Sequence, residues 1–126
     1  MQAKSPDVLV RPAAERRARR SDDMMTALHY QLAFARHQGG FDALVLADSA
    51  GCVVAGAGAW ATCELLAAYA PLLANDASSE APVSDVEIQK LMVAGGEVLL
   101  CARGGGPSRS PSLDRAASGC RRILSA

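Results

Sequence analysis

The first strong pattern in the chain is a pair of short apolar runs separated by a polar turn. Residues 43–47 (Ala-Leu-Val-Leu-Ala) and 52–55 (Cys-Val-Val-Ala) are apolar at every position, so both faces of the two predicted strands should be covered. Asp48 and Gly51 bracket the turn, because Asp can accept hydrogen bonds from the backbone ahead of it and Gly tolerates positive φ. The pattern predicts an antiparallel hairpin that begins at Phe41.

A second hairpin is predicted nearer the C-terminus. Residues 83–94 form its first arm, residues 95–96 (Gly-Gly) its turn and residues 97–103 its second arm. The first arm alternates polar and apolar positions, which predicts that one face of the strand is exposed to solvent. The alternation breaks at residues 90–91, where we expect a β-bulge. The polar positions of that arm are Asp85, Glu87 and Gln89.

Three stretches have helical spacing. The first helix is predicted from Ser21, which with the two aspartates after it makes a good helix start, to about residue 38. The second covers residues 59–74, is apolar over more than half of its circumference, and contains Pro71, which should kink or loosen its last turn. Residues 104–111 have the composition of a flexible linker, and a last helix follows over residues 112–124.

The predicted order is therefore helix, strand, strand, helix, strand, strand, helix. Hairpins imply antiparallel pairing, and three helices cannot all cover one face of a small sheet. We expect an α/β protein of the α+β type: a three-layer α-β-α sandwich around a central antiparallel sheet, with the middle helix opposite the two terminal ones.

Length and composition fit one domain with a tail. The chain has 126 residues, half of them apolar, and only two Phe, two Tyr and one Trp, so the core must be made of Leu, Val, Ala and Met. We assign residues 1–20 to a basic, flexible N-terminal arm and residues 21–126 to a single domain. Residues 13–20 are rich in helix formers, however, and are also compatible with an extension of the first helix.

Charge is balanced overall but unevenly placed. The arm carries six basic residues against Asp7 and Glu15, whereas the rest of the chain carries seven basic and eleven acidic residues. A basic arm can touch nucleic acid or an anionic surface, or it can be a solvated terminus. Because it has no aromatic residue to stack on bases, we do not expect nucleic-acid binding.

The lack of a recognisable targeting signal and the spacing of the cysteines predict a cytoplasmic location. The N-terminus lacks the apolar core of a secretory signal, and no run approaches the roughly 20 apolar residues that span a membrane. The spacing of the four cysteines matches no zinc motif, so we expect free, buried thiols in a reducing compartment. A disulfide between Cys52 and Cys101 is the alternative.

No catalytic or cofactor constellation is visible. His29 and His37 lie two helical turns apart, where a metal pair is better served by a spacing of four, and Ser49 stands in no nucleophile elbow. Residues 56–58 lack the third glycine of a dinucleotide site, and residues 104–106 lack the Lys and Ser/Thr of a phosphate loop. We therefore expect no enzyme activity, no cofactor and no metal.

Several segments together resemble the roadblock/LC7 family of dynein-light-chain-like, GTPase-associated proteins. They are residues 43–55 (ALVLADSAGCVVA), 64–70 (ELLAAYA), 98–101 (VLLC) and 121–124 (RRIL). The resemblance covers about residues 22–126.

The resemblance implies a roadblock/profilin-like fold with a five-stranded antiparallel sheet and dimerisation through the middle helix and middle strand. It also implies binding of a small Ras-like GTPase, and in bacteria a link to cell-polarity GTPases. One departure lies at residues 75–84, which are short and polar where the family has its extra strand. That strand is either missing or merged with residues 86–93, so we expect four or five strands.

The leading hypothesis is a non-catalytic homodimeric scaffold that binds a small GTPase or a related signalling partner. The alternative is a small-molecule sensor domain of GAF or PAS type, which needs a cavity. Trp60 fits an interface or a lid over the core equally well. The residues expected at a dimer or partner interface are Trp60, Glu64, Leu65, Tyr69, Leu72, Leu73, Val86 and Ile88.

Overall fold

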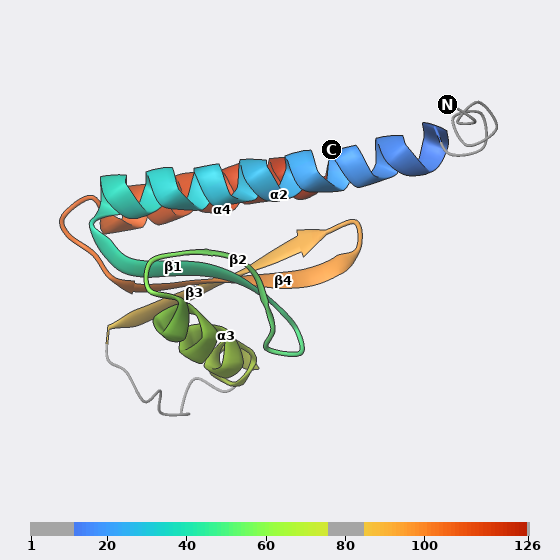
Figure 1. Cartoon of the computed structure of the whole chain (residues 1–126). Helices are drawn as coiled ribbons and strands as arrows, with labels where there is room; N and C mark the ends of the chain where they lie inside the picture. Colours follow the sequence, from blue (N-terminus) through green and yellow to red (C-terminus); the bar gives the residue numbers. More distant parts are fainter. Residues whose placement is uncertain (1–11, 76–84, 126) are drawn as a thin grey trace.

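The computed structural model describes residues 12–75 and 85–125, and these form three helices and four strands in the predicted order (Figure 1). The elements are α2 (Pro12–Gly39), β1 (Phe41–Asp48), β2 (Val53–Ala57), α3 (Trp60–Asn75), β3 (Val86–Val93), β4 (Gly96–Gly104) and α4 (Arg109–Leu124).

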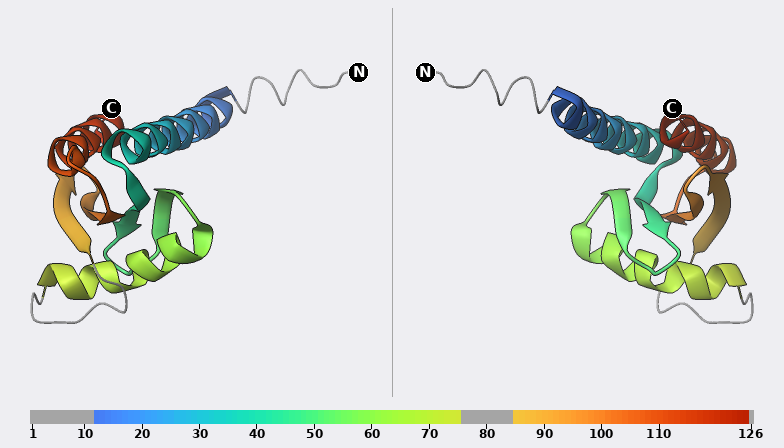
Figure 2. Two further views of the ribbon diagram at one scale, coloured as in Figure 1. Left: turned by 90° about the vertical axis from the view of Figure 1, so that its left-hand side faces the viewer. Right: turned by 90° about the vertical axis from the view of Figure 1, so that its right-hand side faces the viewer.

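The four strands pair in the order β2-β1-β4-β3, and every pairing is antiparallel. Helices α2 and α4 run side by side over one face of this sheet, and α3 lies across the other face (Figures 1 and 2). The α+β class, the three-layer arrangement and the position of the middle helix opposite the terminal helices are confirmed.

Strand β1 is the centre of the molecule because its alternating side chains enter both cores. Leu44 and Leu46 pack with α2 and α4, whereas Ala43, Val45 and Ala47 pack with α3. All five side chains are fully buried. The prediction that both faces of this strand are covered is therefore confirmed.

The turn of the first hairpin follows the predicted chemistry. Asp48 Oδ1 accepts hydrogen bonds from the backbone N–H groups of Ala50 and Cys52, both at 2.9 Å. Gly51 has a φ of 88°, which a residue with a side chain rarely adopts. The aspartate and the glycine together define where β1 ends and β2 begins.

Helix α2 begins at Pro12, well before the start predicted at Ser21. The intervening Ala- and Arg-rich segment has high helix propensity, and this outweighs the capping signal at Ser21. Residues 12–20 are part of this helix, which fits the alternative of a helix extension over residues 13–20, while residues 1–11 lie outside the described part of the chain. Whether those residues act as a separate arm stays a prediction.

The second hairpin differs from the prediction in its turn and its regularity. Val93 pairs with Gly96, so the two-residue turn is Ala94-Gly95 instead of Gly95-Gly96. The register between β3 and β4 is unbroken, and the bulge expected at residues 90–91 is wrong. A continuous ladder pairs the backbone groups that the two arms turn toward each other, and this favours a regular strand over a bulge.

Helix α4 begins at Arg109, inside the predicted flexible linker, so the start expected at Ser112 is wrong. Ser112 is buried in the helix instead of capping it. Helix α3 continues through Pro71 to Asn75. The extra strand of the family pattern concerns residues 76–84, which lie outside the described residues, and the described part of the sheet has four strands.

Candidate interaction surface on helix α3

Helix α3 buries one side against the sheet. Cys63, Leu66, Ala67 and Ala70 are its buried residues, and they pack on Val45 and its neighbours in β1 and β4. Their spacing of three and four residues places them in one stripe along the helix. The opposite side of α3 must therefore face away from the sheet.

That opposite side is apolar where solvent-facing helix surfaces are usually charged. Trp60 is 58% exposed and Leu72 is 56% exposed, and Glu64 is the single charged residue in the whole helix. Leu65, Tyr69 and Leu73 are half-buried at the margins. We call this surface the outer α3 face, and it consists of Trp60, Ala61, Glu64, Leu65, Ala68, Tyr69, Leu72 and Leu73.

The exposed fraction of Trp60 decides whether it is an interface residue or a lid over the core. A tryptophan that lids the core would be largely covered, whereas more than half of this one is accessible. Trp60 is therefore a surface residue at the start of α3. Large amphipathic side chains of this kind often dominate the energetics of protein interfaces.

Two further predicted residues extend this face onto the sheet. Val86 and Ile88 are half-buried and pack against the cluster under α3. They lie on β3, which is an edge strand in the described sheet. The structure thus places six predicted residues on α3 and two on the strand face that α3 covers.

A shallow hollow adjoins this face where α3 begins. Its volume is about 310 Å³ and its lining residues are Gly51, Cys52, Val53, Trp60 and Glu64. The hollow lies at the surface, whereas a sensor domain of GAF or PAS type needs an enclosed cavity. This site offers a contact surface and lacks the enclosure that a small-molecule site requires.

The cysteines are free, and three of them are buried. Burial raises the pKa of the Cys101 thiol to about 12 and that of Cys120 to about 11. Burial also raises the pKa of Cys63. The expected buried state is confirmed for these three but is wrong for Cys52, which is exposed beside the first turn.

Both histidines lie on the exposed surface of α2. His29 Nδ1 is 3.3 Å from the carbonyl oxygen of Gly56, and His37 lies two turns further along. Within residues 12–75 and 85–125, no three His, Cys, Asp or Glu side chains gather where they could hold a metal ion. No described helix is long and apolar enough to cross a bilayer.

Sequence reasoning missed two exposed aromatic residues. Tyr30 is 74% exposed and Phe34 is 58% exposed, both on the outer side of α2. They fall outside the stripe formed by Leu28, Leu32 and Ala35, which is buried. Their spacing of four residues, off the core stripe, is the signal that would have found them.

Comparisons with known proteins concern the fold. No protein-family model and no curated protein matches the chain. Among solved structures the chain is similar to Myxococcus xanthus MglB, a roadblock/LC7-family protein, with a TM-score of 0.48 and 14% sequence identity. That alignment covers 79% of this chain and 88% of the other. The fold assignment rests on the element order and the sheet topology given above.

Proposed function

We propose that this protein is a non-catalytic homodimer held together by the outer α3 face, and that the dimer is a scaffold for a small Ras-like GTPase. The observation that carries the dimer is the near absence of charge on an outward-facing helix, with Trp60 and Leu72 both more than half exposed. An apolar surface of this kind is typical of the centre of an interface.

The physical driving force is removal of this surface from water. Burial of apolar area contributes roughly 25 cal/mol per Å², from which the cost of association must be subtracted. A second copy is a suitable cover because a twofold contact lets each copy bury the same residues against the same residues. Val86 and Ile88, at the sheet edge on this side, extend the contact beyond the helix.

The dimer is tested by measuring molar mass with light scattering at tens of micromolar. Leu72→Glu places a charge on the outer α3 face and should shift the protein to monomer. Phe34→Glu is the matched control, because Phe34 is 58% exposed against 56% for Leu72 and lies on the opposite side of the sheet. A wild-type monomer, or equal effects of the two variants, contradicts the proposal.

The GTPase part rests on the roadblock-like segments of the sequence and on the α-β-β-α-β-β-α order of the described elements. A scaffold without catalytic groups can act on a GTPase only by binding one of its nucleotide states more tightly than the other. The composite surface of the dimer would then favour one arrangement of the switch loops of the GTPase.

The GTPase test has two stages. Immobilised protein is first incubated with extract of the source cell in excess GDP or excess non-hydrolysable GTP analogue, and captured small GTPases are identified. Each is then purified and titrated against wild type and Leu72→Glu in both nucleotide states. Affinities that differ by about tenfold or more between states support the proposal. Equal affinities in both states, or no captured GTPase, contradict it.

A further inference from the structure

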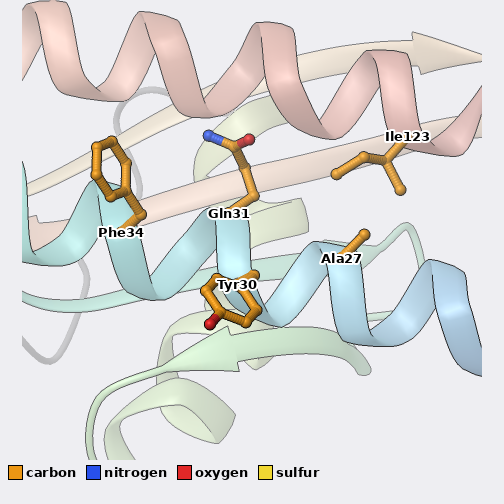
Figure 3. A pocket seen from close by; sticks show the side chains of 5 residues that line it. All are labelled: Ala27, Tyr30, Gln31, Phe34 and Ile123. Atoms are coloured by element: carbon orange, nitrogen blue, oxygen red, sulfur yellow. The ribbon is translucent and has the colours of Figure 1, made fainter.

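The groove between α2 and α4 is a second apolar surface, on the side of the sheet away from α3. Tyr30 and Phe34 stand one helical turn apart on the outer side of α2, and both are more than half exposed. Beside them lies a hollow of about 420 Å³, and Figure 3 shows the side chains that line it. They are Ala27, Tyr30, Gln31, Phe34 and Ile123.

Gly119 of α4 and Gln31 of α2 face each other across this groove. A Cβ atom at Gly119 would overlap the side-chain amide of Gln31, so that amide lies directly against the α4 backbone. A second hollow, of about 370 Å³, lies on the other side of Tyr30 and is lined by Thr26, His29, Tyr30 and Ala33. Tyr30 is therefore a ridge between two depressions, a shape that suits the grooves of another helix.

The α4 rim of the groove is basic. Arg115 and Arg122 lie four residues before and three residues after Gly119, so they share its side of the helix, and both are exposed. Arg109, at the start of α4, is already paired with the carboxylates of Asp85 and Glu87. Asp23 lies four residues before Ala27 and shares its side of α2, so one acidic side chain lies at the end of the groove where Ala27 meets Ile123.

We propose that this α2–α4 groove binds an acidic amphipathic helix of a partner protein. The apolar face of that helix would cover Tyr30, Phe34 and Ile123, and its carboxylates would meet Arg115 and Arg122. The α2 side of the groove carries apolar side chains and the α4 side carries arginines, and this pairing matches the apolar and the acidic faces of such a helix. This surface is separate from the outer α3 face, and the inference does not depend on the proposed dimer.

The probe is a designed fluorescent peptide of about 20 residues, with leucines at positions i, i+3, i+4 and i+7 and glutamates on the remaining positions. Two comparison peptides are used. One has the same composition in scrambled order, and the other keeps the leucine pattern but has lysine in place of glutamate. Binding to the full chain is followed by fluorescence anisotropy, and the contact is located by amide NMR shifts.

The expected result is saturable binding of the patterned acidic peptide, at least about tenfold tighter than binding of either comparison peptide. Amide shifts should centre on Ala27, Gln31 and Gly119. Phe34→Ser should weaken binding by about tenfold or more. The double variant Arg115→Glu with Arg122→Glu should reverse the preference toward the lysine peptide.

Matched controls separate this surface from the rest of the molecule. Leu72→Ser, of similar exposure on the α3 side, should leave the peptide affinity unchanged, and circular dichroism should show that every variant keeps its fold. Equal binding of the acidic and lysine peptides, or shifts centred on α3, overturns the proposal. The proposal is also overturned if the protein does not bind the acidic peptide but sediments with phosphatidylserine vesicles, and if this sedimentation is lost in Phe34→Ser. Loss of the dimer in Phe34→Glu would assign the groove to a second copy and also overturn it.

Discussion

Arg109 Nη1 donates a hydrogen bond to Asp85 Oδ1 at 2.6 Å, and this contact joins the first residue of α4 to the residue directly before β3. Nε of the same guanidinium donates to Glu87 Oε1 at 3.1 Å, and the two hydrogen bonds raise the pKa of Arg109. Asp85 has a φ of 64°, and its carbonyl accepts from the N–H of Gly104 at 2.9 Å. The start of α4 is therefore set by an edge strand that is distant in sequence.

Arg109→Ala should lower the melting temperature, with a larger loss at low salt than at high salt. The reason is that these charges are partly exposed, and mobile ions screen exposed pairs. Thermal unfolding followed by circular dichroism at low and high salt measures this. Arg121→Ala, in the exposed last turn of the same helix, is the control. Equal losses in the two variants at both salt concentrations would contradict the role given to Arg109.

Gly58→Ala should destabilise the protein by about 1–3 kcal/mol from backbone strain alone. Gly58 has a φ of 112°, and a Cβ there would lie 2.7 Å from the carbonyl oxygen of Asp42. Gly95→Ala is the control, because nothing lies within 4 Å of a Cβ at that position, and it should stay within about 0.5 kcal/mol of wild type. Urea unfolding at equilibrium compares the two, and similar losses would refute the steric argument.

The sequence predicts those parts of the fold whose conformation depends on residues close to one another along the chain. The turn at Asp48 depends on its own backbone, and the covered apolar run of β1 lies within one strand. The start of α4 was missed because its contacts with Asp85 and Glu87 come from a distant strand. A composition rich in Gly, Ser and Pro gives no sign of such a contact.

The same distinction applies to the surfaces. Trp60 and Leu72 could be proposed for an interface from sequence because α3 has more apolar positions than one side of a helix can bury. The α2–α4 groove could not be found that way, since Tyr30 and Ile123 become neighbours only when two helices from opposite ends of the chain pack together. The exposed fractions of Tyr30 and Ile123 likewise depend on how α2 packs against α4.

Two leucines of α3 should respond differently to protein concentration. Leu66→Ala removes a buried side chain and should lower the free energy of unfolding by about 2–5 kcal/mol at every concentration. Leu72→Ala should act mainly through the proposed dimer, so its destabilisation should fade as the protein is diluted toward monomer. Urea unfolding over a hundredfold dilution series distinguishes them. A Leu72→Ala loss that is independent of concentration would place Leu72 in the monomer core.

Thiol chemistry should separate the four cysteines. Cys52 is exposed, whereas Cys63, Cys101 and Cys120 are fully buried with raised pKa values, so they hold little thiolate and are shielded from reagents. One thiol should react rapidly with Ellman's reagent at pH 8, and all four should react in denaturant. Cys52→Ser should abolish the rapid phase. Rapid reaction of a second thiol in the native protein would show that one of the buried sites opens.

The raised pKa values also predict how stability changes in alkali. In the unfolded chain a cysteine titrates near 9.0, whereas in the folded protein Cys101 titrates near 12. Above pH 9 the unfolded state therefore loses the proton first, and the stabilisation is fully present below that pH and falls as pH rises toward 12. One such thiol changes the free energy of unfolding by about 1.4 kcal/mol per pH unit.

Cys101→Ala should be less stable than wild type near neutral pH, and the difference should shrink between pH 9 and 11 in urea titrations. A gap that stays constant over that range would mean that Cys101 is less shielded than its burial implies.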